Sequence, residues 1–339
     1  MSRRTLMRRL TALGVTAALA AAIAANPGIV TAQSTPAADA PTGELTVVLP
    51  RSLESLDPHG AVAVEESTAV VLSMVLDTLV TRDPETGDLI PSLATSWEAT
   101  SETSWQFNLR EGVTFHDGSE FTSEDVKASL ERVLELEGPL APLWALVDTV
   151  EAPDPLTVVI NTTEPMGTAP VNASLLFIGP AAGIYEEGFW NEPVGLGPFT
   201  FVSWVPDSEL IAEANPDYWN GSPTVQRVVI RDIPEPAARI TALETGEIDF
   251  TYAIAPDQLP ALQENESLTI DSTPSYAYYF NWFNGQREPF TDVRVRQAMW
   301  HALDVEAMAT ELMQGVGQVA QAPIPSTVFG FSAQTPYEY

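Results

Sequence analysis

An alternation of apolar and polar side chains predicts a β-hairpin in the first third of the chain. Trp105, Phe107 and Leu109 are separated by single polar residues, which is typical of a half-buried strand. A Glu-Gly turn signal follows, and Val113 and Phe115 then alternate in the same way. We therefore expect these two segments to pair with each other.

After this segment, the spacing of apolar residues changes from every second position to every third or fourth, which predicts a helix. Thr122 can cap the N-terminus of the helix, and two acidic residues follow in its positive first turn. Val126, Leu130, Val133 and Leu134 recur at helical spacing and form one apolar face. The helix should bury this face against the predicted strands.

Strands and helices are both predicted along the rest of the chain. The strands are expected at 44–49, 157–160, 199–204, 209–214, 228–233 and 248–250, and the helices at 67–79 and 236–245. Pro236 suits the first turn of its helix, and Gly246 suits its end. Gly195 and Gly197 allow a tight backbone path before the strand at 199.

Aromatic residues are concentrated at 276–283, a run that is predicted to form a strand. They are Tyr276, Tyr278, Tyr279, Phe280, Trp282 and Phe283. Half of an alternating strand points away from the core on which it packs, so part of this run can line a binding surface. Core packing is the alternative, because aromatic residues dominate protein cores.

Length and composition narrow the class of protein. A chain of 339 residues can form two lobes. The absence of cysteine excludes disulfides, thiolate sites and a lipid anchor on an N-terminal cysteine. The net charge of −31 disfavours nucleic-acid binding. It indicates either a cationic ligand or a generally acidic surface, and we favour the surface because the acids are spread along the chain.

The first 32 residues are typical of an export signal. A basic start with four arginines precedes an uncharged, alanine-rich run from Leu10 to Ala25. Small residues then predict cleavage after Ala32, and Ser2 to Met7 resembles a twin-arginine motif. The alternative is an uncleaved anchor, but the apolar run is short for a membrane span. Residues 33–43 are predicted to form a flexible linker.

Catalytic and metal-binding motifs are missing from the sequence. It has no Gly-x-Ser-x-Gly, no His-Glu-x-x-His and no P-loop, so we expect neither an enzyme nor a cofactor. His59, His116 and His301 are far apart in sequence, and His116 has a sufficient role in a turn. No metal site is predicted, although the loop of His59 leaves a metal-binding role open for that residue. Asp57 should stabilise its own turn with an Asx-type hydrogen bond.

Several segments together resemble one protein family. They are PSLATSWE with the following W-x-F-x-LR-x-GV-x-FHDG-x-x-F-T-x-EDV, then VGLGPF, NPDYW, GEIDF and FNWFNGQREPFTDVRVRQAMWHALD. This set resembles the family 5 extracellular solute-binding proteins, which are the peptide- and nickel-binding proteins of ATP-binding cassette importers. The resemblance extends over essentially the whole chain after residue 43.

The resemblance implies an α/β fold of the bilobal, type II periplasmic-binding-protein class. Lobe I would combine residues 44–75 with 185–274, and 76–184 would form an inserted subdomain. Lobe II would begin at 275, and it would be truncated, because the family continues beyond the position of residue 339. The acidic residue that grips a peptide's amino terminus in relatives would also lie beyond residue 339.

The resemblance also implies a function and a binding site. The chain would bind a peptide on the outer side of the membrane and deliver it to a permease; nickel chelates, opines or another small solute are alternative ligands. A secreted enzyme or a non-functional fragment is a further alternative. The residues implied to contact the ligand are Val62, Val64, Leu140, Trp144, Tyr252, Trp282 and Asn284.

Overall fold

The computed structural model describes residues 40–272, 279–314, 316–326, 328 and 331–334. The predicted export signal, and the predicted linker up to residue 39, lie outside the described residues. The chain forms two compact units, which we call unit 1 (Met1–Tyr252) and unit 2 (Ala253–Tyr339). Each unit is described by itself.

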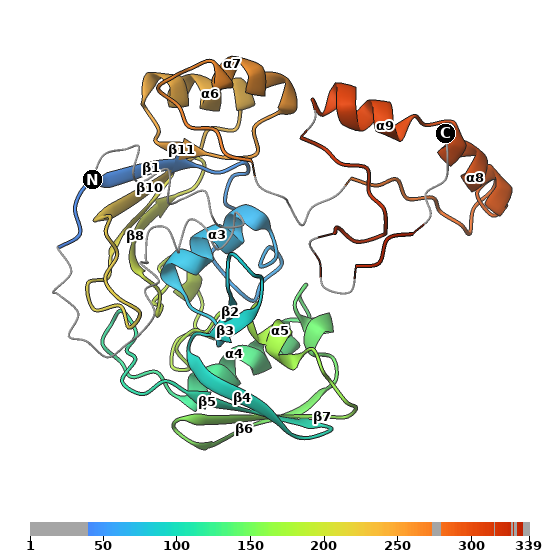
Figure 1. Cartoon of the computed structure of the whole chain (residues 1–339). Helices are drawn as coiled ribbons and strands as arrows, with labels where there is room; N and C mark the ends of the chain where they lie inside the picture. Colours follow the sequence, from blue (N-terminus) through green and yellow to red (C-terminus); the bar gives the residue numbers. More distant parts are fainter. Residues whose placement is uncertain (1–39, 273–278, 315, 327, 329–330, 335–339) are drawn as a thin grey trace. The chain divides into compact units, whose positions relative to one another are not determined.

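Unit 1 contains a mixed five-stranded sheet in the order β11-β1-β10-β9-β8 (Figure 1). The strands are β1 (Glu44–Val48), β8 (Phe199–Val205), β9 (Glu209–Ala214), β10 (Arg227–Arg231) and β11 (Phe250–Thr251). β1 runs parallel to both β10 and β11, whereas β9 is antiparallel to β10 and to β8. The carboxyl ends of the three parallel strands therefore meet at one edge of the sheet.

Two helices belong to this sheet. α3 (Glu66–Val75) buries Val70 and Met74 in one core cluster with Val47 and Phe199, from β1 and β8. α6 (Pro236–Thr245) connects β10 to β11 and ends at Gly246, whose φ of 73° is a left-handed conformation that glycine adopts without strain. The predicted start and end of α6 are confirmed. α3 ends earlier than predicted, at Val75.

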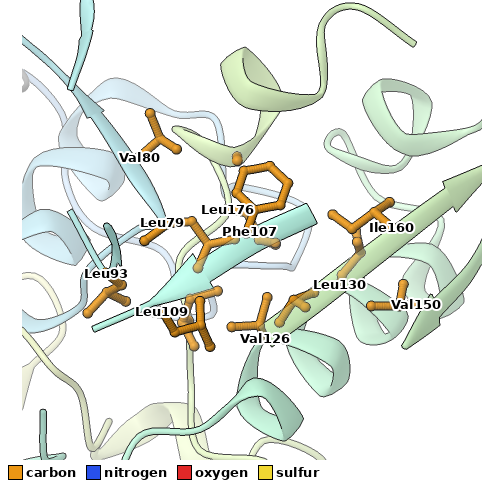
Figure 2. Packing of buried hydrophobic residues seen from close by; sticks show 14 of the residues in the cluster. Leu79, Val80, Leu93, Phe107, Leu109, Val126, Leu130, Val150, Ile160 and Leu176 are labelled. Atoms are coloured by element: carbon orange, nitrogen blue, oxygen red, sulfur yellow. The ribbon is translucent and has the colours of Figure 1, made fainter. Parts of the chain in front are cut away.

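A second sheet in unit 1 is entirely antiparallel, in the order β4-β5-β7-β6. Its strands are β4 (Ala94–Ser101), β5 (Ser104–Leu109), β6 (Val147–Asp154) and β7 (Thr157–Thr162). α4 (Ser123–Leu136) packs against it, and Figure 2 shows Phe107, Ile160, Val126 and Leu130 gathered between helix and sheet. The smaller elements are β2 (Val80–Arg82), β3 (Leu89–Pro91), η1 (Ala141–Trp144), α5 (Ala169–Ala173) and η2 (Phe189–Asn191).

The N-terminus of α4 has the predicted cap. Thr122 donates its backbone N–H to Oδ2 of Asp125 at 2.8 Å, and the two residues form a reciprocal capping box. The apolar face is also confirmed, because Val126, Leu130 and Val133 are buried. This cap and this face fix where the helix begins and which side faces the sheet.

The predicted hairpin is wrong in its second half. β5 pairs with β4 and with β7, whereas residues 113–115 form only an isolated bridge between Thr114 and Glu120. Val113 and Phe115 are nevertheless buried in the same core as β5. Their alternation therefore reflects burial in a loop, because neighbouring positions on β5 are already occupied by two other strands.

A glycine turn joins the two sheets of unit 1. A Cβ atom on Gly195 would lie 1.9 Å from the backbone oxygen of Val75, and one on Gly197 would lie 2.5 Å from the oxygen of Met74. Both positions therefore require glycine, as the tight backbone path predicted. His116 adds a second link, because its Nε2 lies 2.9 Å from the oxygen of Gly197.

Unit 2 consists of short helices. They are η3 (Pro256–Gln258), α7 (Leu259–Gln263), α8 (Val293–His301), α9 (Val305–Ala307) and a π-helical turn, η4 (Met308–Leu312). Asp304 caps α9, since its side chain accepts from the N–H of Ala307 at 2.9 Å. Leu262 is the only buried residue among those described in this unit.

The predicted strand in the aromatic run is not formed at 279–283, and Tyr276 and Tyr278 lie outside the described residues. A strand is held by ladder hydrogen bonds to a neighbour, and the described part of unit 2 contains no other strand. Tyr279 and Trp282 are 92% and 84% exposed. Aromatic content alone therefore did not determine the backbone conformation here.

Candidate functional site

A pocket lies at the carboxyl edge of the parallel strands in unit 1. Its volume is about 390 Å³, and it is lined by Pro50, Arg51, Ser52, Glu54, Val62, Glu65, Thr68 and Pro234. The residues at 50–54 follow β1, and Pro234 follows β10. The pocket therefore lies at the edge where both strands end. Open α/β sheets bind their ligands in the crevice outside the carboxyl ends of the strands. This pocket is the candidate site.

The segment 57–65 forms one wall of the pocket. Val62 lines the pocket, the next residue, Ala63, is 5% exposed in the core, and Val64 is 58% exposed. Ala63 thus anchors the segment while its two neighbours remain available on the surface. Two of the predicted ligand contacts, Val62 and Val64, have the accessibility that such a role requires.

The N-terminus of α3 forms the floor beside this segment. Glu65 caps the helix by accepting from the N–H of Thr68 at 3.0 Å, and its other oxygen lies 3.7 Å from Nε of Arg51. The N–H of Arg51 donates to Oγ of Ser67 at 3.3 Å. Burial, and secondly the charge of Glu65, raise the pKa of Glu66. The pocket is therefore polar and acidic on this side.

Tyr252 follows β11 at the same edge. Its ring packs beside Phe250, with 6.2 Å between the ring centroids. Burial raises the pKa of the Tyr252 hydroxyl, and the charge of Glu66 raises it further. That interaction places Tyr252 beside the start of α3, so the sheet brings Val62 and Tyr252, which are distant in sequence, to one edge.

Leu140 and Trp144 occupy a different environment from the other predicted contacts. Their exposed fractions are 3% and 1%, and both belong to the core cluster that includes Ala63. The loop before them packs closely on segment 57–65, because a Cβ atom on Gly138 would lie 3.1 Å from the oxygen of His59. Their burial favours support of the binding segment over direct contact with a ligand.

Trp282 and Asn284 belong to unit 2. The Trp282 ring contacts Phe280 at a centroid distance of 5.3 Å and is otherwise exposed. Asn284 orders its own turn by accepting from the N–H of Gln286 at 3.1 Å. The role of both residues in ligand binding stays a prediction.

His116 in unit 1 makes a structural contact. His116 bridges to the glycine turn, and burial lowers its pKa. Asp57 forms the predicted Asx turn by accepting from the N–H of His59 at 3.0 Å. The contact between Arg132 and Asp57 could not be predicted from the sequence pattern, because the two residues are 75 positions apart.

The described residues contain neither a grouped set of metal ligands nor a membrane-spanning helix. In the described part of the chain, no three His, Cys, Asp or Glu side chains are grouped as metal ligands. None of the helices within these same ranges combines the length and the apolar character needed to cross a bilayer.

Comparison with known proteins identifies the family. The family model of bacterial extracellular solute-binding proteins, family 5, matches residues 88–339. The chain belongs to this family. Family 5 consists of solute-binding proteins, so the resemblance found in the sequence motifs is confirmed.

Individual family 5 proteins support the same assignment. The probable D,D-dipeptide-binding periplasmic protein DdpA of Escherichia coli is 31% identical over 74% of this chain and 51% of its own length. The oligopeptide-binding protein AppA of Bacillus subtilis, solved with a nonapeptide, matches with a TM-score of 0.77 and 25% identity, over 88% of this chain and 61% of that one. A nickel ABC transporter protein of Bacillus halodurans matches with a TM-score of 0.66 and 31% identity, over 86% and 61%.

These family 5 structures confirm the predicted fold class, an α/β fold of the type II periplasmic-binding-protein architecture. The chain spans about half of the length of the Escherichia coli relative and 61% of each of the two solved chains.

Proposed function

We propose that this chain is the solute-binding component of an ATP-binding cassette importer and that it binds peptides. The observation that carries the proposal is the pocket at the carboxyl edge of β1 and β10 in a family 5 fold. Its wall is a segment with one anchored residue, Ala63, between the accessible Val62 and Val64. Such a wall offers apolar contacts to side chains of an extended ligand.

The proposed ligand contacts are the residues that the family resemblance implies. Val62, Val64 and Tyr252 would act from unit 1, and Trp282 and Asn284 from unit 2. Leu140 and Trp144 would support segment 57–65 from the core. Closure of two lobes on the ligand would favour docking on a membrane permease. The domain boundaries predicted from the sequence, with lobe I at 44–75 and 185–274 and an insertion at 76–184, remain part of this proposal.

Peptides are favoured because DdpA and AppA are described as dipeptide- and oligopeptide-binding proteins. A nickel chelate is the second candidate, because the protein from Bacillus halodurans is described as a nickel transporter protein. Catalysis is not part of the proposal, since the sequence contains no Gly-x-Ser-x-Gly, His-Glu-x-x-His or P-loop motif. The protein would be exported, with residues 1–32 as its signal, and the twin-arginine route is the proposed path.

Thermal unfolding in the presence of defined peptides tests the proposal. A ligand at a hundredfold its Kd stabilises the folded state by about 2.7 kcal/mol, so we expect Tm to rise by about 5 °C or more with a peptide of two to nine residues. Val64→Arg should weaken binding at least tenfold. The matched control is Val202→Arg, because Val202 is also an exposed valine, at 48%, but lies on β8 at the far end of the sheet.

Stabilisation by nickel–histidine complexes and by no peptide would support the second candidate and contradict the first. Equal loss of binding in the Val64 and Val202 variants would show that segment 57–65 is not part of the binding site. Turnover of the peptide during the measurement would indicate an enzyme.

A further inference from the structure

A polar cluster joins segment 57–65 to α4. The guanidinium of Arg132, from α4, donates to both carboxylate oxygens of Asp57, at 2.6 and 2.7 Å. The same Nη1 lies 3.1 Å from Nδ1 of His59, and Nε2 of His59 lies 2.9 Å from the oxygen of Phe177. His59 is completely buried, and the Arg132 guanidinium lies 5.5 Å from the Trp190 ring centroid.

The two hydrogen-bond partners of His59 determine which ring nitrogen carries the proton. A guanidinium only donates and a carbonyl oxygen only accepts, so Nδ1 must accept from Arg132 and Nε2 must donate to Phe177. His59 is therefore neutral. Burial, with the positive charge of Arg132 as a further cause, lowers the pKa of His59 from 6.5 to about 4. For Asp57, burial raises the pKa, but the hydrogen bonds from Arg132 and His59 outweigh this and lower it overall.

The cluster holds one end of the segment whose other end is held by α3. Asp57 orders the turn by accepting from the N–H groups of His59 and Gly60, through its side chain and its backbone oxygen respectively. At the far end, the cap formed by Glu65 joins the segment to the helix. Val62 and Val64 lie between these two fixed points, so their positions depend on both.

We propose that Arg132 is a positioning residue for ligand binding: through Asp57 and His59 it fixes segment 57–65 against the pocket, and protonation of His59 releases the segment. This inference rests on the proposed function, because the segment matters only if its valines meet a ligand. A proton on Nδ1 would face the N–H of Arg132, so the cluster cannot accept it without opening. The charged groups that face His59 are Arg132 and Asp57.

Hydrogen exchange of the backbone amides tests the positioning role without any ligand. We expect Arg132→Met to accelerate exchange at His59 and Gly60 at least tenfold, because Asp57 loses its partner, with β1 and β10 unchanged. Arg231→Met is the matched control: Arg231 also contacts a carboxylate at 2.6 Å, that of Glu247, but on the exposed surface. Exchange in 57–65 that matches the wild type, or that rises equally throughout unit 1, would overturn the proposal.

A second variant distinguishes a positioning role from a general effect on folding. It also provides a test if Arg132→Met fails to fold. His59→Gln keeps a donor and an acceptor but does not titrate. In the wild type, the opening equilibrium of 57–65, obtained from exchange after correction for intrinsic rates, should increase about fortyfold as the pH falls from 6.5 to 4.5, because opening returns the His59 pKa from about 4 to its ordinary value. The Gln variant should show no such rise after correction for intrinsic exchange rates. Identical pH profiles in both proteins would refute the release by His59.

The last measurement is the affinity of each variant for a peptide that stabilises the wild type. Arg132→Met should weaken its binding at least tenfold, whereas Arg231→Met should leave it within twofold. Unchanged peptide affinity in a variant with a loosened segment would overturn the proposal. If no peptide binds the wild type, the proposed function fails, and hydrogen exchange still decides whether Arg132 fixes the segment.

Discussion

Asp77 shows how a single half-buried side chain joins distant parts of unit 1. Its carboxylate accepts from the Tyr218 hydroxyl at 3.3 Å and from Nε1 of Trp219 at 2.7 Å, and the Arg110 guanidinium lies 4.3 Å from the Trp219 ring centroid. Burial raises the pKa of Asp77 from 3.8 to about 7, and the two hydrogen bonds and Arg110 oppose this shift only in part. The carboxyl group therefore holds its proton more tightly in the folded chain than in the unfolded chain.

This residue should make stability depend on pH. Because the folded-state pKa is raised, the folded chain holds a proton that the unfolded chain releases between about pH 4 and pH 7, so its stability falls as the pH rises through this window. Asp77→Asn should abolish this contribution. Its ceiling is about 4 kcal/mol, since a pKa unit corresponds to about 1.36 kcal/mol.

Urea unfolding of both proteins at pH 4.5 and pH 7 measures the effect. We expect the Asn variant to gain stability relative to the wild type on going from the lower to the higher pH. A difference that stays constant over this range would show that Asp77 is ionised throughout.

Local polar contacts could be predicted from the sequence, and distant ones could not. The Asx turn of Asp57 involves a residue two positions away, so the sequence contains all of its determinants. The bond of Asp57 to Arg132 depends on where α4 packs, and the arrival of Val62 and Tyr252 at one edge of the sheet depends on the strand order. Burial of Leu140 and Trp144 was likewise a property of the assembled core.

Among the elements, the turn at 194–199 lies in close contact with α3. It packs directly on the C-terminal end of α3, and the N–H of Gly197 donates to the oxygen of Val75 at 2.9 Å. No side chain fits at Gly195, because the neighbouring atom is backbone and cannot rotate away. The position of α3, and with it the cap at Glu65, depends on this contact.

Gly195→Ala should therefore destabilise unit 1 by about 3 kcal/mol or more, because the new methyl group would overlap the Val75 oxygen. Gly167→Ala is the control, since no atom lies within 4 Å of the added Cβ there, and it should change stability by less than about 0.5 kcal/mol. The free energy of unfolding in urea measures both. Equal stability of the two variants would contradict the close approach.

Strands with one buried face were predicted less well than helices. The face and the cap of α4 follow from residues within one segment, and both are confirmed. β6 was missed because Val150 is its only buried residue, which leaves no alternation to detect. β4 is similarly exposed along most of its length, and the pairing of β5 with it was assigned instead to residues 113–115.

For the whole molecule, the charge distribution agrees with export. The only strongly basic stretch is the first nine residues, and the net charge of the complete chain is −31. Such a basic start before an apolar run favours recognition as a signal. We expect N-terminal sequencing of the exported protein to begin at Gln33. Retention of Met1 on a protein that stays inside the cell would contradict this expectation.

The position of β1 between β11 and β10 has a consequence for how unit 1 folds. β1 pairs with β10 and β11, and its Thr46 N–H donates to a carboxylate oxygen of Asp249, 203 positions later. Closing so long a loop is slow, because its entropy cost precedes the contacts that repay it. The sheet formed by β4, β5, β7 and β6 needs only residues 94–162, so it can form first. During synthesis, β1 emerges early but remains without its neighbours until residue 251 has followed.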